Sequence, residues 1–173
     1  MSKVTIRPEE PGDIETVHLL NVQAFGQPME ARIVDTLRER CRDLLSLVAV
    51  TGGDVVGHIL FSCATIEQSD GTTVRGMGLA PMAVLPEWQR KGIGSKLVEA
   101  GLEQLGARRR PFVIVIGHAE FYPRFGFEPA SKYDVHSEWA VPDEAFMIRI
   151  LDEEAMRGVS GLARYRPEFA EAG

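Results

Sequence analysis

The sequence predicts an α/β fold in which strands dominate the middle of the chain. An amphipathic run that begins at Gly92 repeats its apolar residues at helical spacing. Residues 112–116 are uninterruptedly apolar, as expected for a strand in a sheet that is covered on both faces. The stretches 44–50 and 55–62 flank Thr51-Gly52-Gly53-Asp54, which is a hairpin signal. Strand, helix and hairpin patterns therefore alternate within one chain.

Length, composition and charge restrict the class of protein. The chain has 173 residues, of which 45% are hydrophobic and 25% charged, which suits a single domain over 1–173. A net charge of −6 disfavours nucleic acid as a partner. Cys41 and Cys63 lack metal-ligand spacing, so no metal is expected. The N-terminus has no signal-peptide pattern, and no segment approaches the roughly 20 apolar residues of a membrane span. We therefore expect a cytoplasmic protein with no membrane partner.

The N-terminal third predicts one strand and two helices. Residues 4–7 form the strand, which Pro8 ends. Asp13 is expected to cap the first helix, and Gln27-Pro28 separates it from the second. The apolar residues that mark the two helices are Ile14, Val17, Leu20 and Ala24, then Met29, Ile33 and Leu37.

The rest of the chain alternates turns, strands and one long helix. Ser69-Asp70-Gly71 predicts a turn, and 76–84 predicts the strand after it. The helix from Gly92 is expected to end near Gly106. Two further segments follow: a loop over 117–127 with about one helical turn and a last clear strand over 145–150. The tail, 152–173, is mostly polar and gives only weak signals.

The most informative motif lies where the 76–84 strand meets the long helix. It is Gln89-Arg90-Lys91-Gly92-Ile93-Gly94. Two glycines at this spacing let backbone N–H groups converge at a helix N-terminus, which favours an anion such as phosphate. Leu97 replaces the third glycine of a dinucleotide fingerprint, and the P-loop pattern is also missing. The alternative is a plain turn whose glycines serve close packing.

Two motifs together resemble the GNAT superfamily of acyl-CoA N-acyltransferases. The segment 82–95, with Gln89 and the two glycines, resembles the family's pyrophosphate loop. About thirty residues later, Phe121-Tyr122-Pro123-Arg124-Phe125-Gly126-Phe127 resembles its second signature. The resemblance covers roughly residues 3–150. It is closest to a bacterial stand-alone subgroup of predicted N-acetyltransferases.

The resemblance implies a fold and a donor-binding site. The fold would be a single GNAT-like domain with a mixed, mostly antiparallel twisted sheet of about six or seven strands. This sheet would be splayed at the CoA cleft and carry helices on both faces. Backbone amides of the loop would hold the CoA pyrophosphate, and the strand before it would bind the pantetheine arm. The residues expected to bind acetyl-CoA are Met82, Ala83, Val84, Gln89, Arg90, Lys91, Gly92, Ile93, Gly94 and Ser95.

The resemblance also implies one catalytic residue. Tyr122 occupies the position from which a tyrosine protonates the departing CoA thiolate, although a purely packing role is the alternative. Phe121 and Phe125 would either line the pantetheine arm or belong to the core. Where the family often has an asparagine after the strand, this chain has Gly117-His118. A general base, unless water serves instead, is sought among His118, Glu120, His136, Glu138 and Glu30.

The function expected on these grounds is transfer of an acetyl group from acetyl-CoA, as cosubstrate, to a primary amine in a ternary complex. The amine belongs to a small molecule or a peptide. It would approach from the segments 25–32 and 128–142. Two alternatives stay open: a non-catalytic acyl-CoA sensor or partner module, and an enzyme for a longer acyl donor. The oligomeric state is open between a monomer and a homodimer.

Overall fold

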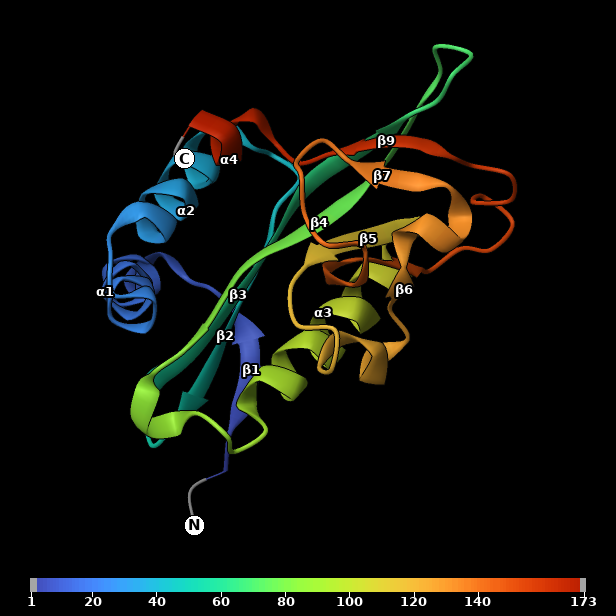
Figure 1. Ribbon diagram of the computed structural model, residues 1–173. Helices are drawn as coiled ribbons and strands as arrows, with labels where there is room; N and C mark the ends of the chain where they lie inside the picture. The colour runs from blue at the N-terminus through green and yellow to red at the C-terminus, as the bar shows by residue number, and fades with distance from the viewer. Residues whose placement is uncertain (1–2, 172–173) are drawn as a thin grey trace. The chain divides into compact units, whose positions relative to one another are not determined.

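A computed structural model describes residues 3–171 and has an α/β fold with a mostly antiparallel sheet of nine strands in this range (Figure 1). The strands are β1 (Thr5–Pro8), β2 (Leu45–Thr51), β3 (Asp54–Glu67), β4 (Thr73–Val84), β5 (Phe112–Ile116), β6 (Glu128–Pro129), β7 (Val135–Ser137), β8 (Phe146–Ile150) and β9 (Gly161–Arg164). The helices are α1 (Ile14–Phe25), α2 (Met29–Arg40), α3 (Ile93–Ala107) and α4 (Pro167–Glu171). The fold class predicted from the sequence is confirmed.

The chain divides into two compact units, and β3 and β4 each run through both of them. The first unit contains 3–61, 80–103 and 167–171, and the second contains 62–79 and 104–166. In the first, β2 pairs antiparallel with β1 and β3. In the second, β5 pairs parallel with β4 and antiparallel with β8, which also pairs with β6. β9 joins β3 antiparallel and β7 parallel.

The sheet has more strands than the six or seven that the sequence predicts. The additional strands are short: β6 has 2 residues, β7 has 3 and β9 has 4. Segments of this length cannot display an alternating pattern, so their pairing partners decide whether they are strands. β9 and α4 lie in the tail 152–173, whose residues 172–173 fall outside the described range. The assignment of 1–173 to a single domain stays a prediction.

Helices cover both faces of the sheet in the first unit. A side chain at Gly57 would contact Ile93 and Leu97 of α3, so this face of β3 meets α3. His58, the next residue, points to the opposite face and contacts Asn21 of α1. Figure 1 accordingly shows α1 and α2 on one side of β2 and β3 and α3 on the other. The predicted arrangement of helices is confirmed for this unit.

The predicted hairpin and the predicted cap have different outcomes. Gly52 and Gly53 join β2 to β3 with φ angles of 57° and 84°, as a type I′ turn requires. Asp13 does not cap α1 with its side chain, which corrects the expectation. Its carboxylate instead accepts hydrogen bonds from Arg7, 2.7 Å away, and from the Glu10 amide. A charged partner outcompetes the neutral amides of the helix.

A buried histidine joins α1 to the sheet. His58 is fully buried, and its two ring nitrogens lie 3.2 Å from Asn21 Nδ2 and 2.8 Å from Ser46 Oγ. This pattern fits a neutral imidazole whose Nδ1 accepts from the amide and whose Nε2–H donates to the hydroxyl. Burial, assisted by the charge of Arg38, lowers the pKa of His58 from 6.5 to about 3. His58 is therefore a structural residue.

We expect His58 to make the fold sensitive to acid. Below pH 6.5 the unfolded chain binds a proton at this residue, whereas the folded chain stays neutral until about pH 3. Stability is therefore fully present above pH 6.5 and falls by up to about 1.4 kcal/mol per pH unit between those values. In denaturant unfolding, the free energy of unfolding of His58→Gln should fall less steeply than that of wild type between about pH 7 and about pH 4. The exposed His118→Gln serves as the control and should retain the wild-type slope.

Candidate functional site

The segment between β4 and α3 is held by its own backbone and one side chain. A short 3-10 helix, Pro86–Trp88, follows β4. The Leu85 amide donates to the Val56 carbonyl of β3 at 2.9 Å, which fixes the start of the turn. The Gln89 side-chain amide reaches back to the Val84 carbonyl, also at 2.9 Å. Gln89 therefore closes the loop on itself with its side chain, and its backbone amide also donates within the loop, to the Pro86 carbonyl at 3.3 Å.

The loop itself contains two residues in a conformation that favours an anion-binding turn. Arg90 and Gly92 have φ angles of 63° and 81°, in the left-handed region. Such residues in a turn create the concave backbone that binds anions. The Lys96 amide donates to the Gly92 carbonyl as the first hydrogen bond of α3. The four preceding amides, from Gly92 to Ser95, consequently have no partner within the helix.

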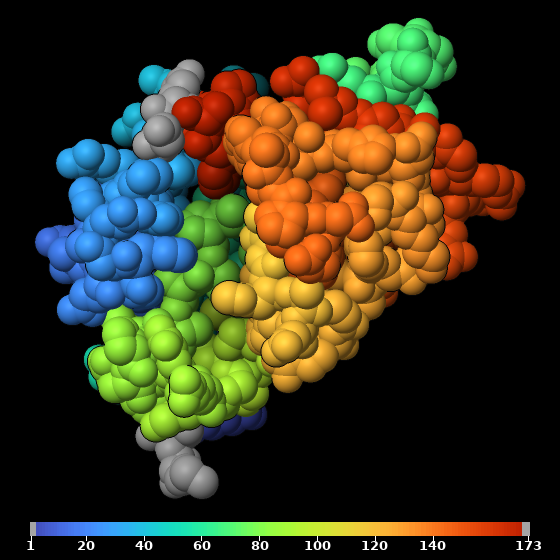
Figure 2. Space-filling view, in the orientation of Figure 1, coloured from blue at the N-terminus to red at the C-terminus, as the bar shows by residue number. Residues whose placement is uncertain are grey.

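The charges around this turn favour an anion. The side chains of Arg90 and Lys91 are exposed, and Lys91 Nζ lies 4.9 Å from the centre of the Trp88 ring. The first turn of α3 has no acidic residue. The partial positive charge of a helix N-terminus therefore meets no carboxylate of its own helix. Figure 2 shows 86–92 at the surface in yellow-green, where a phosphate group has access.

The predicted donor-binding residues offer backbone more than side chains. Seven of them, Gln89–Ser95, form the continuous turn described above. The Ile93 side chain is only 2% exposed and packs into the core, so only its amide can face a ligand. Ala83 is buried, while Met82 and Val84 are half-buried at the end of β4. These residues remain a prediction as a binding site.

In the second unit, β5 ends at a glycine that makes room for Tyr122. The Gly117 amide donates to the Ala145 carbonyl at 2.9 Å. A Cβ at Gly117 would lie 2.5 Å from the Tyr122 ring, closer than atoms can approach. The chain then turns into a 3-10 helix, Tyr122–Phe125. The absence of a side chain at Gly117 therefore determines where the Tyr122 ring can lie.

Aromatic packing fixes this ring. Tyr122 is 7% exposed and makes edge-to-face contacts with Phe121 and Phe127, at centroid distances of 5.0 and 5.5 Å. Burial raises the pKa of Tyr122 to about 12, so its hydroxyl carries a proton at every ordinary pH. Phe121 and Phe125 also contact each other and are half-buried, whereas Phe127 belongs to the core.

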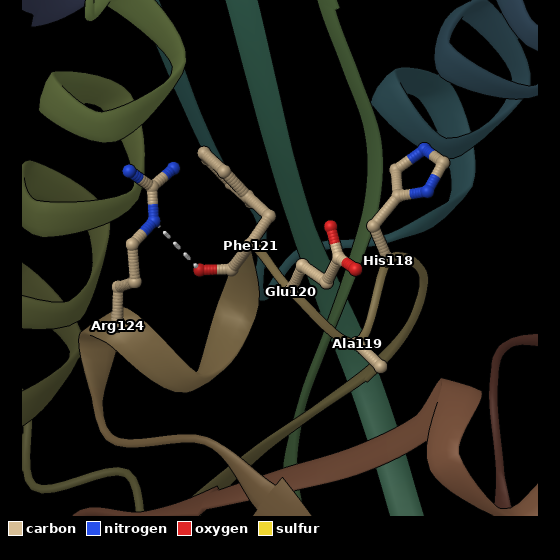
Figure 3. A pocket seen from close by; sticks show the side chains of 5 residues that line it. All are labelled: His118, Ala119, Glu120, Phe121 and Arg124. Carbon is tan, nitrogen blue, oxygen red and sulfur yellow. Dashed lines mark hydrogen bonds between the residues drawn. The ribbon is translucent and has the colours of Figure 1, made fainter.

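An open depression of about 650 Å³ adjoins this element. Its lining residues are His118, Ala119, Glu120, Phe121 and Arg124 (Figure 3). The His118 imidazole and the Glu120 carboxylate extend from the loop on one side of Phe121. The Arg124 guanidinium lies on the other side, 4.8 Å from the centre of that ring. The structure thus brings two of the five candidate bases into one depression.

The other candidate bases have different surroundings. Glu138 accepts a hydrogen bond from the Tyr165 amide at 2.9 Å and lies 3.8 Å from Arg164, which gives it a structural role. His136 pairs with Asp134 at the surface. Glu30, in the first unit, accepts from Gln27. None of these three lines the depression at His118.

In the second unit, Gly117 and Tyr165 carry no motif of their own, whereas Gly126 belongs to the second signature. Gly117 matters because of the Tyr122 ring, which the sequence does not place beside it. Gly126 has a φ angle of 88°, and Arg149, from β8, lies over it and donates to the Phe125 carbonyl. Tyr165 is buried although it follows β9 in the weakly patterned tail. Of these residues, only Gly126 belongs to a motif that the sequence indicates.

Residues 3–171 contain neither a helix that could span a membrane nor a cluster of side chains that could bind a metal. No helix in this range has the length and apolar character needed to cross a membrane. The same residues contain no group of three or more His, Cys, Asp or Glu side chains that could hold a metal ion.

The family model for the acetyltransferase (GNAT) domain matches residues 5–130, well over half of the chain. The curated relatives include YhbS of Escherichia coli K12, an uncharacterised N-acetyltransferase. It is 33% identical over 165 residues, which cover 95% of this chain and 97% of the relative. YjhQ of the same strain, also an uncharacterised N-acetyltransferase, is 37% identical over 143 residues, covering 81% and 78%.

Solved structures agree with these relatives. The crystal structure of E. coli YhbS in complex with CoA has a TM-score of 0.90 at 32% identity, and the match covers 100% of this chain and 95% of that one. A GNAT family acetyltransferase from Brucella melitensis in complex with acetyl-CoA has a TM-score of 0.77 at 31% identity, with coverage of 96% and 98%. Both similar proteins therefore hold the coenzyme that the turn before α3 predicts here.

Proposed function

Because the chain belongs to the GNAT family of acetyltransferases, we propose that it transfers an acetyl group from acetyl-CoA to a primary amine in a ternary complex. The observation that carries the proposal is the turn before α3. Four backbone amides there lack helical partners, two cationic side chains stand beside them, and no carboxylate lies in the first helical turn. Such a turn suits the pyrophosphate of a coenzyme.

Donor binding is assigned to two stretches of backbone. The amides of the turn that follows Gln89, above all those from Gly92 to Ser95, hold the pyrophosphate, with Arg90 and Lys91 contributing charge. The backbone of Met82–Val84 takes the pantetheine arm as an added strand, and one of its amides polarises the thioester carbonyl. A backbone site tolerates many side chains, which explains why the motif is so short.

Acetyl-CoA, when bound, supplies an activated acyl group, so no covalent enzyme intermediate is needed. The neutral amine nitrogen forms a bond to the carbonyl carbon, and the carbon–sulfur bond breaks. The electron pair of that bond stays on sulfur, which takes one proton, while the amine loses one. The protein must therefore donate a proton near sulfur and accept one near nitrogen.

Tyr122 is the proposed proton donor. Its ring is held by the aromatic contacts of the second signature and by the space at Gly117. Burial, which raises the pKa of Tyr122 to about 12, keeps the proton on oxygen until a strong base is formed beside it. A thiolate in the same dry surroundings is also made more basic, so the transfer stays favourable.

His118 and Glu120 are the proposed groups for receiving the amine proton, either directly or through water. Both line one open depression, where solvent can carry the proton away. Glu120 also offers a negative charge to an ammonium group before it is deprotonated. The acceptor is proposed to be a small molecule or a peptide, and a cytoplasmic location and a homodimer stay predictions.

We expect acetyl-CoA to bind and to stabilise the protein. At about 100 times its dissociation constant, a ligand that binds only the folded state adds about 2.7 kcal/mol. Calorimetric titration and thermal unfolding measure the two effects, and adenosine and pantetheine serve as separate controls for the ends of the coenzyme. Failure of any CoA thioester to bind at about millimolar concentration would remove the basis of the proposal.

Catalysis is tested by the release of free thiol from acetyl-CoA with pooled amines, amino acids, polyamines and peptides. Thiol release that depends on one of the amines supports the enzyme. Binding of acetyl-CoA without thiol release from any pool would instead indicate a sensor. Parallel assays with butyryl- and palmitoyl-CoA determine whether the donor carries a longer chain.

A further inference from the structure

Arg124 is held in one position without a charged partner. Its Nε–H donates to the Phe121 carbonyl at 3.3 Å, and its guanidinium lies 4.8 Å from the centre of the Phe121 ring and 5.7 Å from that of Phe125. Arg38 shows the usual alternative, since it pairs with two carboxylates. Within residues 3–171, Arg124 has no such ion pair, and of its five N–H donors only the one on Nε has an acceptor. An exposed guanidinium that is fixed in this way is prepared for an anion.

The depression beside Arg124 carries one charge of each sign. Its lining includes the Glu120 carboxylate and the Arg124 guanidinium, with the Phe121 ring between them (Figure 3). His118 adds an imidazole on the same side as Glu120. Like Arg124, Glu120 is exposed and forms no ion pair within the part of the chain that the structure describes. Two opposite charges in one depression of about 650 Å³ are therefore both available to a ligand.

This charge pattern discriminates among the classes of amine. A polyamine brings several positive charges, of which the single carboxylate of the lining can pair with one, while the guanidinium repels the others. The N-terminus of a peptide brings one positive charge and leaves the guanidinium without a partner. An amine that also carries a carboxylate matches both charges at once. Complementary charges favour the correct ligand, and like charges exclude the wrong one.

We propose that the acetyl acceptor is an amino acid, whose carboxylate binds Arg124 and whose amino group lies beside Glu120 and His118. This assignment rests on the proposed function, which places the amine in this depression. The planar guanidinium of arginine presents paired N–H donors that match the two oxygens of a carboxylate. The half-buried Phe121 ring between the two charged groups offers apolar surface to the carbon atoms that join the two ends of the substrate.

The reaction changes how the depression holds its ligand. Acetylation forms the bond from nitrogen to the acetyl carbon and converts the amino group, after loss of its proton, into a neutral amide. The carboxylate is unchanged, so the product keeps its ion pair with Arg124 but loses the attraction of Glu120. An N-acetyl amino acid should consequently bind on the order of tenfold more weakly than the amino acid, which favours its release.

Turnover of matched acceptors is the first test. Standard amino acids are compared with their carboxamides, which keep the amine and the side chain but lack the negative charge. The measured quantity is the ratio of kcat/KM for the amino acid to that for its carboxamide. Arg124→Gln should lower this ratio by at least about tenfold, and the lower basicity of the carboxamide cancels because it affects every variant equally. Arg157→Gln is the matched control, because Arg157 is an exposed arginine of the same unit that does not line the depression.

Binding without the donor is the second test and needs no turnover. In NMR spectra of arginine-labelled protein, an amino acid should shift the Nε–H resonance of Arg124, which the Arg124→Gln variant identifies by its disappearance. Carboxamides and polyamines should leave this resonance unshifted, and N-acetyl amino acids should shift it only at about tenfold higher concentration. Glu120→Gln should remove most of the difference between substrate and product, because the carboxylate that attracts the ammonium group is then absent.

An unchanged kcat/KM ratio in Arg124→Gln, or an equal change in Arg157→Gln, would overturn the proposal, as would an Arg124 resonance that no amino acid shifts. Acetylation of polyamines or peptides in preference to amino acids would overturn it too, while leaving the proposed function intact. If no amine at all releases thiol from acetyl-CoA, the proposed function fails, and the titration of the Arg124 resonance alone then decides whether the depression is an amino-acid site.

Discussion

Tyr122→Phe is expected to lower kcat for acetyl transfer by at least about tenfold, since general acid catalysis is typically worth about 10²- to 10⁴-fold, while KM for acetyl-CoA stays nearly constant. The substitution removes only the hydroxyl. The ring keeps its contacts with Phe121 and Phe127, so the stability of the protein and its affinity for CoA should change little. The departing thiolate loses its proposed proton donor, so the loss should appear in the chemical step alone. Single-turnover rates on the amine found by the screen give the measurement.

The pH dependence of this loss follows from burial. Because burial raises the pKa of Tyr122 to about 12, the hydroxyl is protonated throughout the usual assay range. The ratio of wild-type to variant kcat should therefore be constant from about pH 6 to about pH 10. A descending limb in that range, if one is seen, belongs to another group and should persist in the variant. Rates within twofold of wild type at every pH would show that Tyr122 only packs.

A second variant tests the position of the Tyr122 hydroxyl by changing the residue next to its ring. Gly117→Ala leaves Tyr122 intact but places a methyl group 2.5 Å from its ring, so the ring must move. If the position of the hydroxyl matters, kcat should fall in this variant too, although by less than in Tyr122→Phe. Gly106→Ala is the matched control, since a Cβ there meets nothing within 4 Å.

The parts of the fold that the sequence could predict are those with local causes. The β2–β3 hairpin needs two residues with positive φ, and the consecutive glycines Gly52 and Gly53 indicate it. The turn before α3 is local in the same sense, because its conformation depends on Arg90, Gly92 and the start of one helix. A continuous motif of this kind predicts the same local conformation wherever it occurs in a chain.

The parts that escaped prediction depend on distant partners. Asp13 has the sequence context of a helix cap, but Arg7 lies close enough to take its carboxylate. β9 has 4 residues and no pattern, and it is a strand because β3 and β7 pair with it. Tyr165 could not be distinguished from a surface tyrosine without knowing that Gly78 leaves space for its ring. Each of these contacts joins residues that only the folded chain brings together.

Gly92→Asp is expected to abolish binding of acetyl-CoA, with a loss of affinity of at least about 100-fold. The aspartate would place a negative charge beside the amides that are proposed to hold pyrophosphate, and two like charges at this short distance repel each other. The mutation creates no collision, since a Cβ at Gly92 meets nothing within 4 Å. Its φ angle of 81° adds some strain. Calorimetric titration measures the affinity, and Gly94→Asp should act similarly from the first turn of α3.

Gly92→Asn separates charge from strain. Asparagine has nearly the shape of aspartate and tolerates the left-handed region, so it imposes the same backbone cost without the charge. Its affinity for acetyl-CoA should therefore lie between those of wild type and Gly92→Asp, and Arg90→Ala should also retain part of the binding because the amides remain. If the Asp and Asn variants bound equally well, the phosphate would have to lie elsewhere.

Without coenzyme, the order of stability of the Gly92→Asp and Gly92→Asn variants should be the reverse of their order of affinity for acetyl-CoA. A negative charge at a helix N-terminus interacts favourably with the helix dipole by about 0.3–1 kcal/mol, so the Asp variant should be slightly more stable than the Asn variant when no coenzyme is present. Addition of acetyl-CoA should reverse this order, because only the variant that binds gains stability from the ligand. The amides that attract the introduced carboxylate in the free protein are the same ones that are proposed to hold the coenzyme. Thermal unfolding of both variants, with and without acetyl-CoA, therefore tests whether the turn before α3 is an anion site at all and whether the anion belongs to the donor.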